Sequence, residues 1–121
     1  MDRGVGLVRT PDVELRWWQG CPSTERALDE LREAMWELGL DAGGIRMTEI
    51  ETDEGAEAVG FVGSPTILID GGDVQPPGDD EPVGLSCRVY RRGDGRVLPT
   101  PDPDRLRAAL SRAAHAVQVN E

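Results

Sequence analysis

Two cysteines, Cys21 and Cys87, are the residues of this 121-residue chain best suited to nucleophilic chemistry. Cys21 is followed by Pro22 and then by a run with helical spacing, which predicts Pro22 at the first helical position and Cys21 at or next to the N-cap. The unpaired N–H groups and partial positive charge of a helix N-terminus favour a thiolate, the attacking form of cysteine. We therefore expect Cys21 to be a nucleophile. The alternative is a small buried apolar residue beside a turn.

The rest of the composition narrows the chemistry. All 13 basic residues are arginine, which excludes a lysine Schiff base and the phosphate-binding loop that ends in Gly-Lys. His115 is the single histidine, so neither a Ser-His-Asp triad nor a zinc site with several histidines is expected. The net charge of −10 disfavours nucleic acids and anionic membrane surfaces as partners. We expect no cofactor and no resident metal.

The chain is expected to form one domain, residues 1–121, in the cytoplasm. The first ten residues lack the apolar region of a secretory signal, and no apolar run approaches the roughly 18–20 residues that cross a bilayer. In the cytoplasm both cysteines stay reduced, and a structural disulfide between them is the less favoured alternative.

Hydrophobic periodicity predicts an α/β fold. Apolar and polar residues alternate, or β-branched residues cluster, in four expected strands, 13–17, 45–50, 66–70 and 85–89. Helical spacing predicts three helices: one from Pro22 to a stop at Gly39, one over 54–59, and one that starts at Asp102 or Asp104 with an apolar face reaching Val117. The order β-α-β-α-β-β-α predicts a four-stranded mixed sheet flanked by helices. Residues 1–12 are expected to form a loose arm, and 71–83, rich in Gly, Pro and Asp, an exposed loop.

Two motifs resemble those of thioredoxin-like proteins. A strand that ends in tryptophan, a short turn and then Cys21-Pro22-Ser23-Thr24 opening an amphipathic helix resemble the active-site motif of that family. The segment Gly63-Ser64-Pro65-Thr66, ahead of an Ile/Leu strand, resembles its cis-proline segment. The resemblance covers about residues 13–118, nearly the whole chain. It implies a thioredoxin-like fold with Cys21 as the nucleophile.

The resemblance also implies roles for the neighbours of Cys21. A cis peptide before Pro65 would turn the backbone of Ser64 toward the thiol, where its free N–H and C=O would pair with an extended partner chain. A trans Pro65 that starts an edge strand is the alternative. Trp18 is expected to shield one side of the thiol, and Trp18, Pro22 and Ser64 to contact the partner. Trp17 would then point to the other face of the strand, toward the core, and packing of both tryptophans in the core is the alternative.

Thr24 departs from the family pattern. Many relatives carry a second cysteine at this position, which attacks the mixed disulfide and releases the partner, and a threonine cannot perform that step. We therefore expect monothiol chemistry, in which Cys21 forms mixed disulfides with a protein or with a small-molecule thiol or disulfide. The Thr24 hydroxyl would hydrogen-bond the thiolate. The alternative of another class is a non-catalytic thioredoxin-like binding module.

Cys87 is not expected to replace the missing cysteine. In the resembled topology it lies four strand residues from the active-site edge, which at ~3.3 Å per residue is on the order of 13 Å. The Cα atoms of a disulfide lie within about 7 Å of each other. Cys87 is therefore expected to be a core thiol packed with Leu85 and Val89, unless the 71–83 loop shifts the register.

A weaker resemblance connects the chain to small bacterial proteins labelled alkylmercury lyases. It rests on Gly-Ser-Pro-Thr at 63–66, Ile-Asp-Gly at 69–71 and the later Ser86-Cys87-Arg88-x-Tyr90. In true organomercurial lyases two cysteines bind the metal and an aspartate protonates the leaving carbon. The resemblance implies that Cys21 and Cys87 hold a soft metal or an organomercurial. The aspartate position, however, falls near Thr24, which cannot serve as the acid.

Overall fold

The computed structural model describes residues 9–115, which form a mixed α/β fold with a four-stranded sheet and three α-helices. Its elements in chain order are β1 (Val13–Trp17), α1 (Thr24–Glu37), the short 3-10 helix η2 (Ala42–Gly44), β2 (Arg46–Glu49), α2 (Asp53–Val59), β3 (Thr66–Ile69), β4 (Gly72–Asp73), β5 (Tyr90–Arg91), β6 (Val97–Leu98) and α3 (Pro103–His115). The predicted α/β class and the predicted four-stranded mixed sheet are confirmed.

The sheet has the strand order β2-β1-β3-β4. β1 pairs in parallel with β2 and antiparallel with β3, and β3 pairs antiparallel with β4. The two inner strands carry the most apolar sequences: all four residues of β3 are buried, and Val13 and Leu15 of β1 belong to the core. Most of β2 is exposed, as its polar sequence and its place at the sheet edge require.

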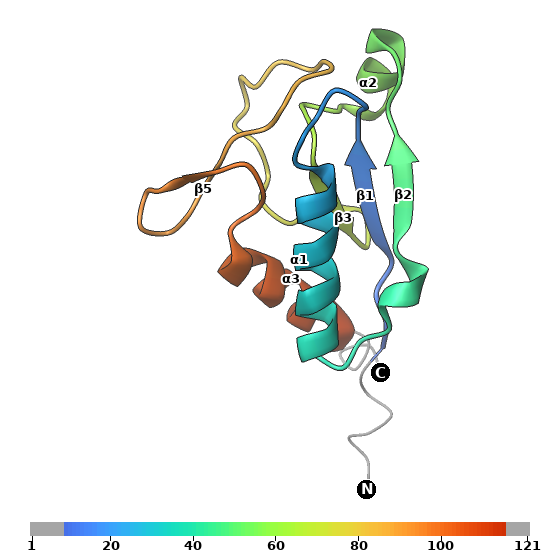
Figure 1. The fold of residues 1–121 in the computed structure, drawn as a ribbon, viewed down its shortest axis with the longest axis vertical. Helices are drawn as coiled ribbons and strands as arrows, with labels where there is room; N and C mark the ends of the chain where they lie inside the picture. Colours follow the sequence, from blue (N-terminus) through green and yellow to red (C-terminus); the bar gives the residue numbers. More distant parts are fainter. Residues whose placement is uncertain (1–8, 116–121) are drawn as a thin grey trace, which may run out of the picture.

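Helices α1 and α3 lie side by side against one face of the sheet (Figure 1). Each helix buries one apolar stripe, with Leu31 and Met35 from α1 and Leu106 and Leu110 from α3, as their spacing predicts. These side chains form the main core together with Val13, Leu15, Ile67 and Ile69 of the sheet. Val117, the last expected member of the α3 stripe, lies outside the described residues. None of the helices in residues 9–115 is long and apolar enough to span a membrane.

The helix ends follow local sequence signals with one difference. Gly39 has a φ of 73° just after the C-cap of α1, as its predicted role as a stop requires, and the Thr52 side chain caps α2 by accepting from Gly55 N–H at 2.9 Å. Pro22, however, is not the first helical position. α1 has its N-cap at Ser23 and begins at Thr24, so Cys21 lies in the turn two residues before the cap.

The predicted strand 85–89 is wrong. The fourth strand of the sheet is β4, because the chain reverses at Asp70 and Gly71, both at positive φ, and pairs at once with β3. Residues 85–89 contribute only an isolated bridge between Ser64 and Cys87, and the following β5 pairs with β6 in a separate hairpin. The alternation also has the opposite phase, because Arg88 is buried whereas Val89 is 67% exposed.

The two segments expected to be irregular make specific contacts. In the described part of the N-terminal arm, residues 9–12, the Arg9 guanidinium pairs with Asp70 at 2.8 Å and the Arg9 backbone N–H donates to the C=O of Ala114 at 2.9 Å. The 71–83 segment begins with β4, and Val74 and Gln75 are buried before the chain becomes exposed from Gly78 onward. Both segments therefore contribute to the packing of the sheet.

Candidate functional site

The connection from β1 to α1 places Cys21 beside the connection from α2 to β3, at the same end of the sheet (Figure 1). The Cys21 side chain is mostly buried, with 8% of the residue exposed. Its Sγ accepts a hydrogen bond from the Ser23 backbone N–H at 3.4 Å and donates one to the Ser64 C=O at 3.5 Å. The predicted proximity of Cys21 to the Ser64–Pro65 peptide, which is cis, is confirmed.

The backbone of Ser64 is not free for a partner, contrary to the sequence-based expectation. Its N–H donates to the C=O of Ser86 at 2.8 Å, and its C=O accepts from the N–H of Arg88 at 2.9 Å. Residues Ser86–Arg88, which we name the bridging segment, therefore occupy the positions that an extended partner chain would take. Their middle residue is Cys87, which forms a parallel bridge with Ser64.

The bridging segment brings Cys87 next to Cys21, so its prediction as a distant core thiol is wrong. The Cys87 residue is exposed, and both cysteines are free thiols. Partial desolvation raises the pKa of the Cys87 thiol, and charge repulsion from the neighbouring Cys21 raises that pKa further. The expected separation assumed that Cys87 lies on a strand of the main sheet, whereas Cys87 lies outside that sheet and forms an isolated bridge with Ser64.

Arg88 anchors the bridging segment. Its buried guanidinium donates from Nη1 to Asp73 at 2.7 Å and to Thr66 Oγ1 at 3.2 Å, and from Nη2 to the C=O of Gln75 at 2.7 Å. The same group lies 4.3 Å above the centre of the Tyr90 ring. A buried charge is stable only when it is paired and hydrogen-bonded, and Arg88 meets both conditions. The contacts of Arg88 therefore fix the residue next to Cys87.

Gly63 and Tyr90 complete the support of the bridging segment. Gly63 has a φ of 140°, and a Cβ atom there would lie 2.8 Å from Arg88 Cγ and 3.2 Å from the Ser86 carbonyl oxygen. A side chain at this position would push the segment away. The Tyr90 hydroxyl donates to the C=O of Pro65, and burial raises the pKa of Tyr90, so the hydroxyl stays a donor at neutral pH.

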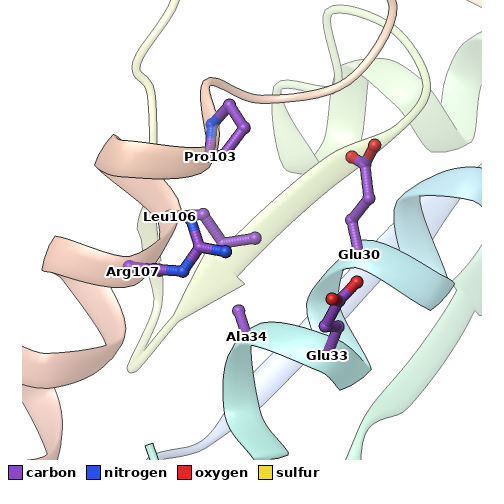
Figure 2. A pocket seen from close by; sticks show the side chains of 6 residues that line it. All are labelled: Glu30, Glu33, Ala34, Pro103, Leu106 and Arg107. Atoms are coloured by element: carbon purple, nitrogen blue, oxygen red, sulfur yellow. The ribbon is translucent and has the colours of Figure 1, made fainter. Parts of the chain in front are cut away.

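A cavity of about 460 Å³ opens onto Cys21. We name it the thiol cavity; it is lined by Trp17, Cys21, Pro22, Thr24, Glu25, Leu28 and Met47. A second cavity, of about 210 Å³, lies between α1 and α3 and contains neither cysteine (Figure 2). In Figure 2, Arg107 of α3 extends toward the α1 side that carries Glu30 and Glu33. Of these two cavities, only the thiol cavity gives a small molecule access to a nucleophile.

Several buried polar atoms around Cys21 have no hydrogen-bond partner within the described part of the chain. Besides Thr100 Oγ1, they are Trp17 Nε1, Trp18 Nε1, Thr24 Oγ1 and Ser64 Oγ, all from residues that contact Cys21 or line the thiol cavity with it. The Thr24 hydroxyl therefore does not make the hydrogen bond to the Cys21 sulfur that the sequence led us to expect. Buried polar groups in folded proteins are ordinarily hydrogen-bonded, and exceptions concentrate where a site serves chemistry. Their grouping at the thiols therefore supports a functional role for this end of the sheet.

The structure brings together most of the predicted site residues. Cys21, Pro22 and Thr24 line the thiol cavity, and the Cys21 sulfur donates to the C=O of Ser64, which precedes Pro65.

The structure places the two tryptophans in different surroundings. Trp17 packs against the main core, as expected, and also lines the thiol cavity. Trp18 packs against a second cluster of Ile50, Ala56 and Phe61, and its ring lies against Gly20, the residue before Cys21.

Sequence reasoning missed the anchoring residues Arg88, Asp73 and Tyr90. The sequence-based prediction places Leu85, Cys87 and Val89 facing inward, whereas Arg88 and Tyr90 are the buried residues of this segment. Considering the opposite alternation would have drawn attention to Arg88 and Tyr90. Gly63 is a second signal, because a glycine beside the bridging segment permits close backbone approach.

Comparisons with protein-family models, with curated proteins and with solved structures find no match for this chain. The chemistry of the site therefore has to be inferred from its own residues. Within residues 9–115, no group of three or more His, Cys, Asp or Glu side chains is placed to hold a metal ion. The juxtaposition of two thiols from distant parts of the sequence is the most specific feature of the site.

Proposed function

We propose that this protein is a thioredoxin-like thiol–disulfide exchange protein in which Cys21 is the attacking thiol and Cys87 the resolving thiol. The observation that carries the proposal is that both cysteines meet at the Ser64 backbone: the Cys21 sulfur donates to the Ser64 C=O, and Cys87 forms a bridge with Ser64. The element order and the β2-β1-β3-β4 sheet, with a cysteine before α1 and a cis-proline before β3, support the thioredoxin-like assignment.

The division of roles between the two thiols follows from their surroundings. The Ser23 N–H donates to the Cys21 sulfur, and such a bond strengthens when the sulfur becomes a thiolate. Cys87 has a raised pKa, which keeps it protonated while Cys21 attacks. Once Cys21 has formed a mixed disulfide it carries no charge, so its repulsion of the Cys87 thiolate ends and Cys87 ionises more easily.

The proposed cycle exchanges one disulfide for another. The Cys21 thiolate attacks one sulfur of a disulfide R–S–S–R, forms Cys21–S–S–R and releases R–S⁻. Cys87 loses its proton to solvent, attacks the Cys21 sulfur and releases the second R–S⁻. The protein is left with a Cys21–Cys87 disulfide, and the substrate has gained two electrons. An external thiol reductant, of the kind that the cytoplasm supplies, returns the pair to dithiols.

Cys87 thereby takes the place of the cysteine that the motif lacks. Thr24 still prevents a dithiol cycle inside Cys21-Pro22-Ser23-Thr24, as its residue type requires. We propose a two-thiol mechanism in place of the monothiol mechanism, because the second thiol comes from the bridging segment.

A single-turnover experiment tests the proposal. The reduced protein is mixed with a small disulfide, quenched with an alkylating agent and analysed by peptide mass spectrometry. The wild-type chain is expected to release two equivalents of thiol and to yield the Cys21–Cys87 disulfide. Cys87→Ser should release one equivalent and stop at the mixed disulfide on Cys21. A Cys87→Ser variant that still releases two equivalents would contradict the assignment of the resolving thiol.

The same thiol pair favours a second candidate function, the capture of a soft metal ion. Two thiolates form a linear site for Cu(I) or Hg(II), and Cys21 and Cys87 both contact the Ser64 backbone. This function predicts tight Cu(I) binding that is lost in both Cys21→Ser and Cys87→Ser. Competition with a chromophoric Cu(I) chelator measures it, and equal affinity of the wild type and both variants would remove it.

A further inference from the structure

Access to Cys21 is restricted on the side where an extended polypeptide would bind. The Ser64 N–H and C=O are both paired with the bridging segment, at 2.8 Å and 2.9 Å. That segment is held by the buried Arg88 guanidinium and its bonds to Asp73 and Gln75. A partner chain would have to displace these contacts before it could pair with Ser64. The open approach to the sulfur is the thiol cavity.

The thiol cavity has the size and lining of a site for a small molecule. Its volume, about 460 Å³, falls in the range of ordinary ligand sites. Trp17, Leu28 and Met47 supply apolar walls, and Met47 is 43% exposed. Apolar walls of this kind bind a ligand by removing apolar surface from water.

The charge of the thiol cavity selects against anions. Glu25 is the one charged residue among those that line it, and no arginine is among them. The whole chain carries a net charge of −10, which adds to the repulsion. A disulfide with carboxylate groups would therefore meet like charge at the cavity and find no cation to pair with.

We infer that the substrate of this site is a small, uncharged disulfide with an apolar body, which enters the thiol cavity and reacts at Cys21. This inference rests on the proposed function and adds its substrate class. The bonds change as in the proposed cycle: the S–S bond of the substrate breaks, a Cys21–S–S–R bond forms, and one thiolate leaves through the cavity. Cys87 then completes the transfer of two electrons from the protein to the substrate.

Two chromogenic aromatic disulfides that differ in charge test the inference. Dithiodipyridine is neutral, and dithiobis(nitrobenzoate) carries two carboxylates. Each is mixed with the reduced full-length protein and, separately, with a free model thiol, and thiol release is followed by absorbance. For the protein and for the free thiol, the rate with the neutral probe is divided by the rate with the carboxylate probe. We expect this ratio to be about tenfold or more higher for the protein than for the free thiol. Cys87→Ser confines the reaction to Cys21 and should keep the preference.

Matched variants locate the source of the preference. Glu25→Gln should raise the rate with the carboxylate probe several-fold relative to the rate with the neutral probe. Glu33→Gln removes the same charge from α1 away from the thiol cavity and should change neither rate. Met47→Ala should slow the neutral probe about threefold by removing an apolar wall. Val59→Ala, with a similar exposed fraction of 44%, should have no effect.

The outcomes separate the two proposals. If neither probe modifies Cys21 faster than the free thiol, the proposed exchange function fails. If both probes react at Cys21 with the same ratio as the free thiol, exchange stands and the inferred substrate class is overturned. Equal effects of Glu25→Gln and Glu33→Gln would also overturn it, because the selectivity would then come from net charge and not from the thiol cavity.

Discussion

Substituting Arg88 with lysine should weaken the Cys21–Cys87 disulfide without removing a charge. The guanidinium bonds Asp73 through one nitrogen and the C=O of Gln75 through the other, and it stacks on Tyr90. A lysine can keep the contact with Asp73 but has no planar fork to reach both partners. The bridging segment would then be held less firmly next to Cys21.

The size of the effect follows from the bonds that lysine loses. A hydrogen bond to a charged group contributes about 1.5–3 kcal/mol. Losing the bond to Gln75 should therefore reduce the free energy that holds the bridging segment in place by roughly 2 kcal/mol. The disulfide must then be formed from a less ordered segment. For a two-electron couple, 2 kcal/mol corresponds to a reduction potential higher by about 40 mV.

Titration in thiol–disulfide buffers measures this shift. Wild type and Arg88→Lys are equilibrated in a series of glutathione ratios, alkylated, and assayed for the Cys21–Cys87 disulfide. Arg107→Lys is the matched control, because Arg107 pairs with Glu37 on the surface, away from the thiols. If Arg88 holds Cys87 in position, its replacement must change the reduction potential of the Cys21–Cys87 disulfide. A folded Arg88→Lys protein with the wild-type potential would therefore refute the positioning role of Arg88.

Three further variants probe contacts at the site and in the surrounding fold. Gly63→Ala should lower the free energy of unfolding by about 1–3 kcal/mol in urea titrations, because a Cβ at a φ of 140° meets Arg88; unchanged stability would contradict the close approach. Thr52→Ala should lower the free energy of unfolding by about 1 kcal/mol, because it removes the N-cap of α2. An unchanged urea midpoint would show that the cap does not contribute to stability. The hydrogen bond to Arg9 lowers the pKa of Asp70 in the folded protein. The pair therefore stabilises the fold fully at pH values above the pKa of an ordinary carboxyl group, and this stabilisation is lost as the pH falls through the lowered pKa of Asp70. In Asp70→Asn, the free energy of unfolding should therefore fall less steeply as the pH is lowered. An unchanged pH dependence would show that the Arg9–Asp70 pair does not contribute to stability.

The elements that hold Cys21 were predictable because their signals are local. The alternation in Val13–Trp17, the stripe of Leu31 and Met35, and the stop at Gly39 each depend on residues close in sequence. The predicted cis peptide before Pro65 and its nearness to Cys21 came from two short motifs.

The position of Cys87 was not predictable because it depends on contacts between distant residues. Strand β4 has two residues, too few for periodicity to detect, and it takes the sheet edge that the expected strand 85–89 was to fill. Arg88 is buried because Asp73 neutralises it, and a hydrophobic pattern assigns such a residue to the surface. With the phase of 85–89 inverted, Cys87 was placed in the core.

The central claim is that Cys21 and Cys87 form one redox pair. Its most direct test is to oxidise the full-length protein at low concentration in a glutathione buffer and to map every cysteine by mass spectrometry after alkylation. The account predicts a single two-electron transition to an intramolecular Cys21–Cys87 disulfide, without accumulation of glutathione adducts. Two independently titrating thiols, each ending as a separate glutathione mixed disulfide, would contradict it.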